Sequence, residues 1–210
     1  MFYLVITASI INKFGVIDAE TRKTQYITAI TETLQHLPSD IIPIIVENNG
    51  ARSTYLDNFT KEGKPVKVIY TDNNKYKFKN KGINELLDIK EVIRREGIKE
   101  SDIVIKLTGR YTVKSSIFFI QIASESDKYD GWIKYYNVCA QEFNRMSTVT
   151  GFYALRCIFF ALWNPMTVEA YDSIESAFAR YSTICTARIC EIDDLGVECC
   201  FAEDFKVLLL

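Results

Sequence analysis

This 210-residue sequence contains a single histidine and no glycine-rich phosphate-binding loop. Its one histidine, His36, falls inside an amphipathic segment, which indicates a structural residue and argues against a histidine-based catalytic triad. No G-x-S-x-G elbow occurs. The sequence also lacks G-x-x-x-x-G-K-[ST] and G-x-G-x-x-G, so P-loop and dinucleotide-binding sites are disfavoured.

Metal-binding and export signals are missing as well. Six cysteines occur without a Cys-x-x-Cys pair, so the spacing of a zinc site is absent and free thiols in a reducing compartment are expected. The apolar N-terminus lacks the basic region of a secretory signal. The longest later apolar run, Cys157–Trp163, is too short to span a bilayer. We therefore expect a soluble, cytoplasmic protein with no membrane span.

The composition predicts a folded chain with no excess of charge. Hydrophobic residues make up 48% and charged residues 25%, which is typical of a globular domain. The net charge of -2 gives no general attraction to nucleic acid, so no nucleic-acid partner is expected. A bound anion must then be held by a local cluster of basic groups.

The first half alternates strand-like and helix-like segments, which predicts β-α-β units and a Rossmann-like, mostly parallel sheet. The expected strands are Phe2–Ile11, Ile41–Val46, Val66–Tyr70 and Asp102–Leu107. The expected helices are Thr21–Leu37, a short one at Ser53–Lys61, and Lys79–Glu96. This pattern predicts an α/β fold with a mixed sheet flanked by helices.

The second half is less regular. We expect a helix or strand at Ile117–Ser124, one strand or a strand pair at Tyr129–Val138, a strand then a helix in Gly151–Leu162, and helices at Glu169–Thr183 and Val197–Val207. No Pro-, Gly- or Ser-rich linker divides the chain, so residues 1–210 are expected to form a single domain. Its apolar end predicts a fragment of a longer polypeptide with further domains.

Small and polar residues end each predicted strand of the first half, where an open parallel sheet binds its ligands. These strand ends are Thr7-Ala8-Ser9, Glu47-Asn48-Asn49, Thr71-Asp72-Asn73-Asn74 and Thr108-Gly109-Arg110-Tyr111. Together they could frame a base, a ribose and a phosphate. The alternative is that they are turn residues only.

One segment is densely basic. Lys75, Lys77, Lys79 and Lys81 alternate with other residues directly before a predicted helix, whose N-terminus favours anions. With Arg110 from a neighbouring strand end, they would suit a diphosphate. A solvated loop is the alternative.

Two carboxylates, Glu203 and Asp204, lie on an otherwise apolar segment near the C-terminus. A carboxylate there could act as general base on an acceptor hydroxyl or stabilise a developing oxocarbenium charge. A solvated helix face explains them equally well.

These motifs resemble the GT-A class of glycosyltransferases. The resemblance is carried by Leu4–Ser9, Asn80-Lys81-Gly82, Ile105–Tyr111 and Thr150–Arg156. It implies a UDP-sugar donor, bound in residues 1–113, and an acceptor site in residues 114–210. The implied donor-binding residues are Thr7, Ala8, Ser9, Asp72, Lys79, Asn80, Lys81 and Gly82. The implied substrate-binding residues are Thr108, Gly109, Tyr111, Gly151 and Phe152.

The sequence departs from the GT-A class at the metal site. Such enzymes often hold the diphosphate through Mn²⁺ or Mg²⁺ on an Asp-x-Asp pair after the fourth strand. At that place this sequence reads Thr108-Gly109-Arg110, and it contains no Asp-x-Asp pair at any other position. Arg110 and the lysines could neutralise the diphosphate directly. Alternatively, a metal could bridge it through one carboxylate, Asp72 or Asp204. The residues leave both routes open.

The predicted function is transfer of a hexose from a UDP-sugar of the glucose or rhamnose type to a sugar hydroxyl of a growing glycan, with catalysis by Arg110, Glu203 and Asp204. The sequence is most similar to chlorella-virus glycosyltransferases, which implies the glycan of a viral capsid protein as acceptor and the host cytoplasm as location. Two alternatives are a sugar-nucleotidyltransferase and a non-catalytic carbohydrate-binding domain.

Overall fold

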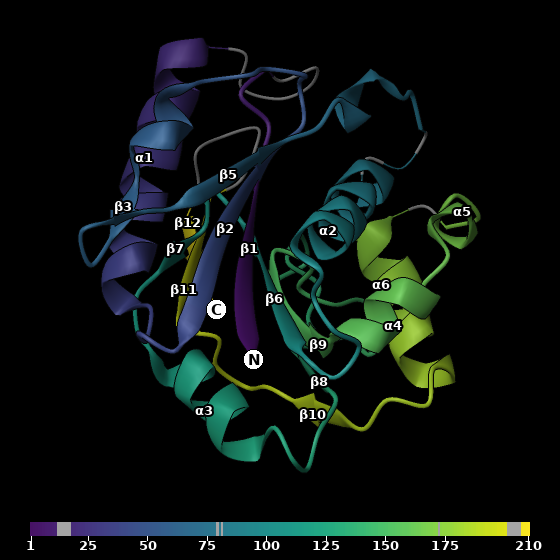
Figure 1. The fold of residues 1–210 in the computed structure, drawn as a ribbon. Coiled ribbons are helices and arrows are strands. Elements are labelled where there is room, and N and C mark those ends of the chain that lie inside the picture. The colour runs from purple at the N-terminus through teal and green to yellow at the C-terminus, as the bar shows by residue number, and fades with distance from the viewer. Residues whose placement is uncertain (12–17, 79, 81, 172, 201–206) are drawn as a thin grey trace.

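The computed structural model describes residues 1–11, 18–78, 80, 82–171, 173–200 and 207–210. Within these ranges, seven strands form one central sheet with helices on both faces (Figure 1). Their order across the sheet is β10 (Ile189–Glu191), β8 (Gly131–Ile133), β9 (Phe152–Arg156), β6 (Ile103–Thr108), β1 (Phe2–Ala8), β2 (Ile41–Glu47) and β5 (Lys67–Tyr70). β9 runs antiparallel to β6 and β8, whereas the other neighbouring pairs are parallel. The predicted mixed, mostly parallel α/β sheet is confirmed.

Helices connect the parallel strands of the first half. α1 (Ala19–His36) leads from β1 to β2, and α2 (Gly82–Glu96) leads from β5 to β6. α1 begins at an N-cap, because a carboxylate oxygen of Asp18 accepts a hydrogen bond from the backbone N–H of Thr21 at 2.8 Å. The chain then turns into an extended conformation at Leu37, directly before Pro38, as the sequence predicts.

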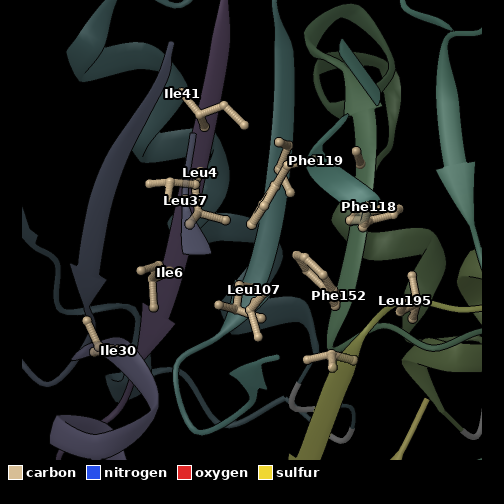
Figure 2. Packing of buried hydrophobic residues seen from close by; sticks show 14 of the residues in the cluster. Leu4, Ile6, Ile30, Leu37, Ile41, Leu107, Phe118, Phe119, Phe152 and Leu195 are labelled. Atoms are coloured by element: carbon tan, nitrogen blue, oxygen red, sulfur yellow. The ribbon is translucent and has the colours of Figure 1, made fainter. Parts of the chain in front are cut away.

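The alternation of side chains along β1 divides the core into two layers. Leu4 and Ile6 lie in the layer that contains Ile30 of α1 and the phenylalanines of α3 (Ile117–Glu125), as the packing in Figure 2 shows. Tyr3 and Val5 face the other way, toward α2, α4 (Cys157–Leu162) and α6 (Ile174–Ile184). Because both faces are covered, the strand is apolar throughout its length.

Aromatic side chains fill the layer on the α2 side. The Trp163 ring stacks on Phe178 with 4.9 Å between centroids and on Tyr181 with 5.0 Å. Trp163 follows α4 and precedes the short helix α5 (Pro165–Val168), which packs against α2. This stack joins α4 to α6, and the packing of α5 on α2 links these helices to the first half.

The predicted final helix, Val197–Val207, is wrong. β11 (Val197–Cys200) pairs with β7 (Thr112–Val113) on one side and β12 (Val207–Leu209) on the other, in an antiparallel sheet. Val197 and Cys199 are buried, whereas Glu198 and Cys200 are partly exposed, which is the two-residue period of a strand. A short apolar run can form either a helix or a strand, and here the partner strand β7, about 85 residues earlier in the chain, favours the strand.

The predicted short helix at Ser53–Lys61 is only partly correct. A single 3₁₀ turn, η1 (Tyr55–Asn58), is followed by a hairpin of β3 (Thr60–Lys61) and β4 (Lys64–Pro65). Glu62 and Gly63 form the hairpin tip with φ of 53° and 75°. Another 3₁₀ turn, η2 (Asn73–Lys75), follows β5. No helix in the described parts of the chain is long and apolar enough to cross a membrane.

Phe152 tests the core beneath the strand ends. Its side chain is fully buried and makes edge contacts with Phe118 at 4.6 Å and Phe119 at 5.7 Å between centroids. Phe152→Ala should lower the free energy of unfolding by about 3–5 kcal/mol, because it leaves a cavity. Phe143→Ala, at an exposed phenylalanine, should cost less than about 1 kcal/mol. Urea unfolding measures both, and equal losses would contradict this packing.

Candidate functional site

The strand ends named in the sequence meet at one edge of the sheet. Thr7 lies opposite Thr108, Ala8 lies opposite Glu47, and Glu47 lies opposite Tyr70 in the pairing of the parallel strands. The loops that follow these strands therefore converge, as the carboxyl edge of an open parallel sheet requires. This edge is the candidate site.

Polar side chains tie the first two strand ends together. The Asn49 amide donates to Glu47 Oε1 at 2.5 Å and to Ser9 Oγ at 3.1 Å. The fully buried Glu47 carboxylate also accepts from the backbone N–H groups of Ile10 and Asn49. Beside this network, Asn49, Asp72, Asn74 and Lys75 line an open pocket of about 200 Å³. Hydroxyl, amide and carboxylate groups of this kind suit a ribose or a base.

A buried carboxylate on α2 holds the next two strand ends. Asp88 accepts hydrogen bonds from the Asn48 amide at 2.9 Å, the Thr71 hydroxyl at 2.7 Å and the Asn73 amide at 2.7 Å. Burial raises the pKa of Asp88 to about 6, although these donors lower it. Asp88 thus fixes the ends of β2 and β5 relative to α2.

Two arginines lie where β1 and β6 end. Arg22, on α1, is 4% exposed, and its Nη2 donates to the Ser9 carbonyl at 2.7 Å and to the Tyr26 hydroxyl at 3.3 Å. Tyr26 lies beneath Gly109, because a Cβ atom at Gly109 would stand 3.0 Å from its ring. Arg110 follows directly and is half-buried. Among the described residues, Arg22 Nε and Arg110 Nη1 are buried without a hydrogen-bond partner.

The charge of Arg110 acts on Arg22. The pKa of Arg22 is lowered, first by burial and then by the positive charge of Arg110, while Tyr26 and Tyr55 raise it. Burial also raises the pKa of Tyr55 well above its usual range. The strand ends of β1 and β6 therefore carry concentrated positive charge.

Tyr111 and Gly151 pack tightly beside Arg110. A Cβ atom at Gly151 would stand 1.9 Å from the Tyr111 ring, so the close approach requires glycine. The Thr108 N–H donates to the Gly151 carbonyl at 2.7 Å, which joins the β6 end to the β9 start. Burial raises the pKa of Tyr111 far above its ordinary value, and the Cys199 thiol contributes.

A buried lysine marks the other side of β6. Lys106 donates to Thr108 Oγ1 at 2.6 Å and to the Thr150 carbonyl at 2.8 Å, and it pairs with Glu85 of α2 at 2.7 Å. Thr150 in turn donates to the Glu175 carboxylate at 3.0 Å. Glu175 begins α6 and its charge acts on Tyr111, so it lies close to the Arg110–Tyr111 strand end.

The predicted donor-binding residues occupy different positions. Ser9 is half-buried at the edge, whereas Thr7 and Ala8 are 4% and 3% exposed and belong to the strand scaffold. Asn80 accepts from the Gly82 N–H at 3.1 Å. A Cβ atom at Gly82 would stand 2.3 Å from the Ile174 side chain, so this glycine permits the contact between α2 and α6.

Of the remaining residues predicted for the site, the structure describes some and not others. Asp72 is exposed and pairs with Lys75 at 2.5 Å, which holds the pKa of Asp72 below its usual value. Lys77 is exposed. The residues Lys79, Lys81, Glu203 and Asp204 lie outside the described residues.

The side chains described at the strand ends do not form a binding site for a metal ion. In the described ranges, no three His, Cys, Asp or Glu side chains gather closely enough to hold a metal ion. Asp72 is paired with a lysine, and the strand end Thr108-Gly109-Arg110 presents a cation instead of a carboxylate. These described residues do not fit a divalent cation.

Comparison with known proteins identifies the fold. No protein-family model and no curated protein matches the sequence. A nucleotide-diphospho-sugar transferase from Desulfovibrio desulfuricans has a TM-score of 0.54 at 10% identity, over 90% of this chain and 78% of that one. Mouse xyloside xylosyltransferase 1 has a TM-score of 0.53 at 12% identity, over 91% and 85%. The fold is GT-A-like.

A nucleotidyltransferase shares the fold too. The 4-diphosphocytidyl-2C-methyl-D-erythritol synthase from Anaerococcus prevotii has a TM-score of 0.53 at 12% identity, over 91% of this chain and 88% of that one. At such identities the likeness is one of fold. The function must therefore be argued from the residues at the carboxyl edge.

Sequence reasoning missed Arg22, Glu47 as a buried carboxylate, Asp88, Lys106 and Glu175. Asp88 and Lys106 had a visible signal, since each is a charged residue on the apolar face of a predicted helix or strand. Arg22 and Glu175 stand near helix starts, where charged residues are common, so nothing in the sequence singled them out.

Asp88 gives the fold a specific pH dependence. Because folding raises its pKa, its contribution to stability is complete below about pH 4 and is lost as pH rises through about 6. Between pH 4.5 and pH 7, the unfolding free energy of the wild type should fall relative to Asp88→Asn by about 2 kcal/mol. Urea titrations of both proteins measure this difference.

Asp57→Asn is the matched control for this experiment. Desolvation is the largest single influence on Asp57 and raises its pKa, but hydrogen bonds from Thr54, Ser53 and Tyr70 together lower that pKa below its usual value. The difference between the wild type and Asp57→Asn should therefore change with pH in the opposite direction. If the difference in unfolding free energy between the wild type and Asp88→Asn stays constant with pH, that result would contradict the burial of an ionisable Asp88.

Proposed function

We propose that this chain is a glycosyltransferase that moves a hexose from a UDP-sugar, of the glucose or rhamnose type, to a sugar hydroxyl of a growing glycan. The observation that carries the proposal is Arg110, whose guanidinium is half-buried and incompletely hydrogen-bonded at the β6 end. That position lies at the same edge of the sheet as the polar pocket at the β2 and β5 ends, in a fold whose solved examples include nucleotide-sugar transferases.

The donor is proposed to bind across residues 1–113. Ser9, Asn49 and Asp72 supply hydroxyl, amide and carboxylate groups for the uridine, and the Asp88 network keeps their loops in place. The acceptor is proposed to bind on residues 114–210, near Gly151. Phe152 lies behind that site and supports it from the core.

Arg110 is proposed to stabilise the leaving group. As the acceptor oxygen bonds to the anomeric carbon, the bond from that carbon to the diphosphate oxygen breaks and negative charge develops on the diphosphate. A guanidinium can meet two of its oxygens at once. The basic segment that contains Lys75 and Lys77, with Lys79 and Lys81, would add long-range attraction.

The acceptor hydroxyl loses its proton in the same reaction, so a carboxylate is needed if that hydroxyl attacks directly. Glu203 and Asp204 stay predictions for this role. Glu175 is a second candidate, because its carboxylate lies beside Thr150 and acts on Tyr111. The viral capsid glycan expected from the sequence resemblance stays a prediction for the acceptor.

UDP release tests the transferase directly. With a panel of UDP-sugars and simple sugar acceptors, the wild type should release UDP from one donor, and Arg110→Ala should lower kcat by about 100-fold or more. Arg180→Ala, at an exposed arginine on α6, should keep wild-type turnover. If no UDP-sugar is bound or turned over, a non-catalytic carbohydrate-binding domain becomes the better account.

A sugar-nucleotidyltransferase is the second candidate, because a cytidylyl-type synthase shares the fold. It would release pyrophosphate from a nucleoside triphosphate and a sugar phosphate. Assays with UTP or CTP and hexose 1-phosphates distinguish this activity from that of a glycosyltransferase. Pyrophosphate release in these assays, without UDP release from any UDP-sugar, would favour the nucleotidyltransferase over the glycosyltransferase.

Glu175→Gln tests the acceptor side separately. Glutamine keeps an oxygen to accept the Thr150 hydrogen bond but cannot take a proton, so kcat should fall by about 100-fold with little change in donor KM. Glu142→Gln, on an exposed loop, is the control. A kcat within twofold of wild type would exclude Glu175 as the base.

A further inference from the structure

We propose that Arg22 and Arg110 together form a metal-independent site for a diphosphate group, with Arg22 as a second binding residue on α1. This inference rests on the proposed function, because it assigns the anion to the nucleotide-sugar donor. It goes further by naming a residue and a way of neutralising charge that the GT-A resemblance does not imply.

The first support is the burial of Arg22. Its side chain is almost inaccessible, and one nitrogen, Nη2, bonds to the Ser9 carbonyl and the Tyr26 hydroxyl. Both acceptors are uncharged. The guanidinium carbon also lies 5.6 Å from the centre of the Tyr26 ring, so the ring fixes its plane. Nε remains buried and has no acceptor among the described residues.

The second support is the position of Arg110. Tyr26 is the common support, since its ring carries Arg22 and also lies beneath Gly109, directly before Arg110. Arg110 Nη1 is likewise buried without an acceptor among the described residues. The charge of Arg110 lowers the pKa of Arg22, which places the two groups within electrostatic reach of each other.

The third support is the missing negative charge. The ion pairs found in the described chain include neither arginine. A buried and a half-buried charge of the same sign are costly without a carboxylate, and an anion bound between them would offset that cost. A diphosphate supplies two negatively charged phosphate groups, and a guanidinium can donate two parallel hydrogen bonds to a pair of oxygens on each.

The contrast with Arg156 supports this assignment. Arg156 is a partly buried arginine at the opposite edge of the sheet, and there Asp130 and three backbone carbonyls accept its hydrogen bonds. Where the fold needs an arginine for structure alone, it surrounds the group with acceptors. At Arg22 and Arg110 it leaves donors open instead.

Inorganic pyrophosphate in EDTA is the probe for this site. By titration calorimetry the wild type should bind it, and Arg22→Gln and Arg110→Gln should each weaken binding by about 10- to 100-fold. Arg22→Lys keeps the charge but loses the planar fork, so it should fall between wild type and Arg22→Gln. Arg180→Gln is the control and should bind as the wild type does.

Thermal unfolding shows whether a variant has lost pyrophosphate binding or has simply failed to fold. Pyrophosphate should raise the Tm of the wild type and of Arg180→Gln, but raise that of Arg110→Gln far less. Arg110→Gln loses no hydrogen bond found in the described chain, so its Tm without pyrophosphate should not fall below that of the wild type by more than about 2 °C. This variant therefore tests the site even if Arg22→Gln unfolds.

Two results would overturn the proposal: no pyrophosphate binding by the wild type in EDTA, or equal affinity in Arg22→Gln and wild type. The outcomes separate this inference from the proposed function. UDP-sugar turnover that requires Mn²⁺, with no pyrophosphate binding in EDTA, would keep the transferase and reject the arginine site. Tight pyrophosphate binding without turnover of any UDP-sugar would keep the site and reject the transferase.

Discussion

A buried and a half-buried guanidinium group, those of Arg22 and Arg110, share the corner where β1 and β6 end, and no ion pair found in the described chain joins either to a carboxylate. Arg22 is held by neutral oxygens and an aromatic ring, and Arg110 keeps one nitrogen without an acceptor among the described residues. Positive charge in so dry a place has a large effect on any anion that reaches it. The surrounding structure positions this charge: Gly109 lets Tyr26 approach, and Tyr26 in turn supports Arg22.

The negative charges of the same edge are kept apart from the guanidinium groups. Glu47 is turned toward backbone N–H groups, Asp88 toward amides and a hydroxyl, and Glu85 toward Lys106. Glu47 and Asp88 organise loops, Glu85 ties α2 to β6, and no ion pair found in the described chain joins any of them to the two arginines. The edge thus combines hydrogen-bonded loops with guanidinium nitrogens that have no acceptor among the described residues, which is a preorganised arrangement for stabilising charge that develops on a leaving group.

The sequence predicted the first half well because its signals are local. Apolar spacing located α1 and α2, and continuous apolar runs located β1, β2 and β6. The segment after Val197 was misjudged because its strand partner, β7, lies far away in the sequence. The site was predicted in outline at the strand ends, including Arg110. Arg22, Asp88 and Glu175 were missed, since their roles arise from contacts that only folding creates, such as Asp88 with Asn48, forty residues earlier.

A crystal structure of the protein with UDP, grown in EDTA, tests the central claim most directly. The account predicts diphosphate oxygens within about 3 Å of Arg22 Nε and Arg110 Nη1, with the uridine over the Ser9–Asn49 pocket. A diphosphate bound away from both guanidinium groups, or both arginines paired with carboxylates of the chain, would contradict it.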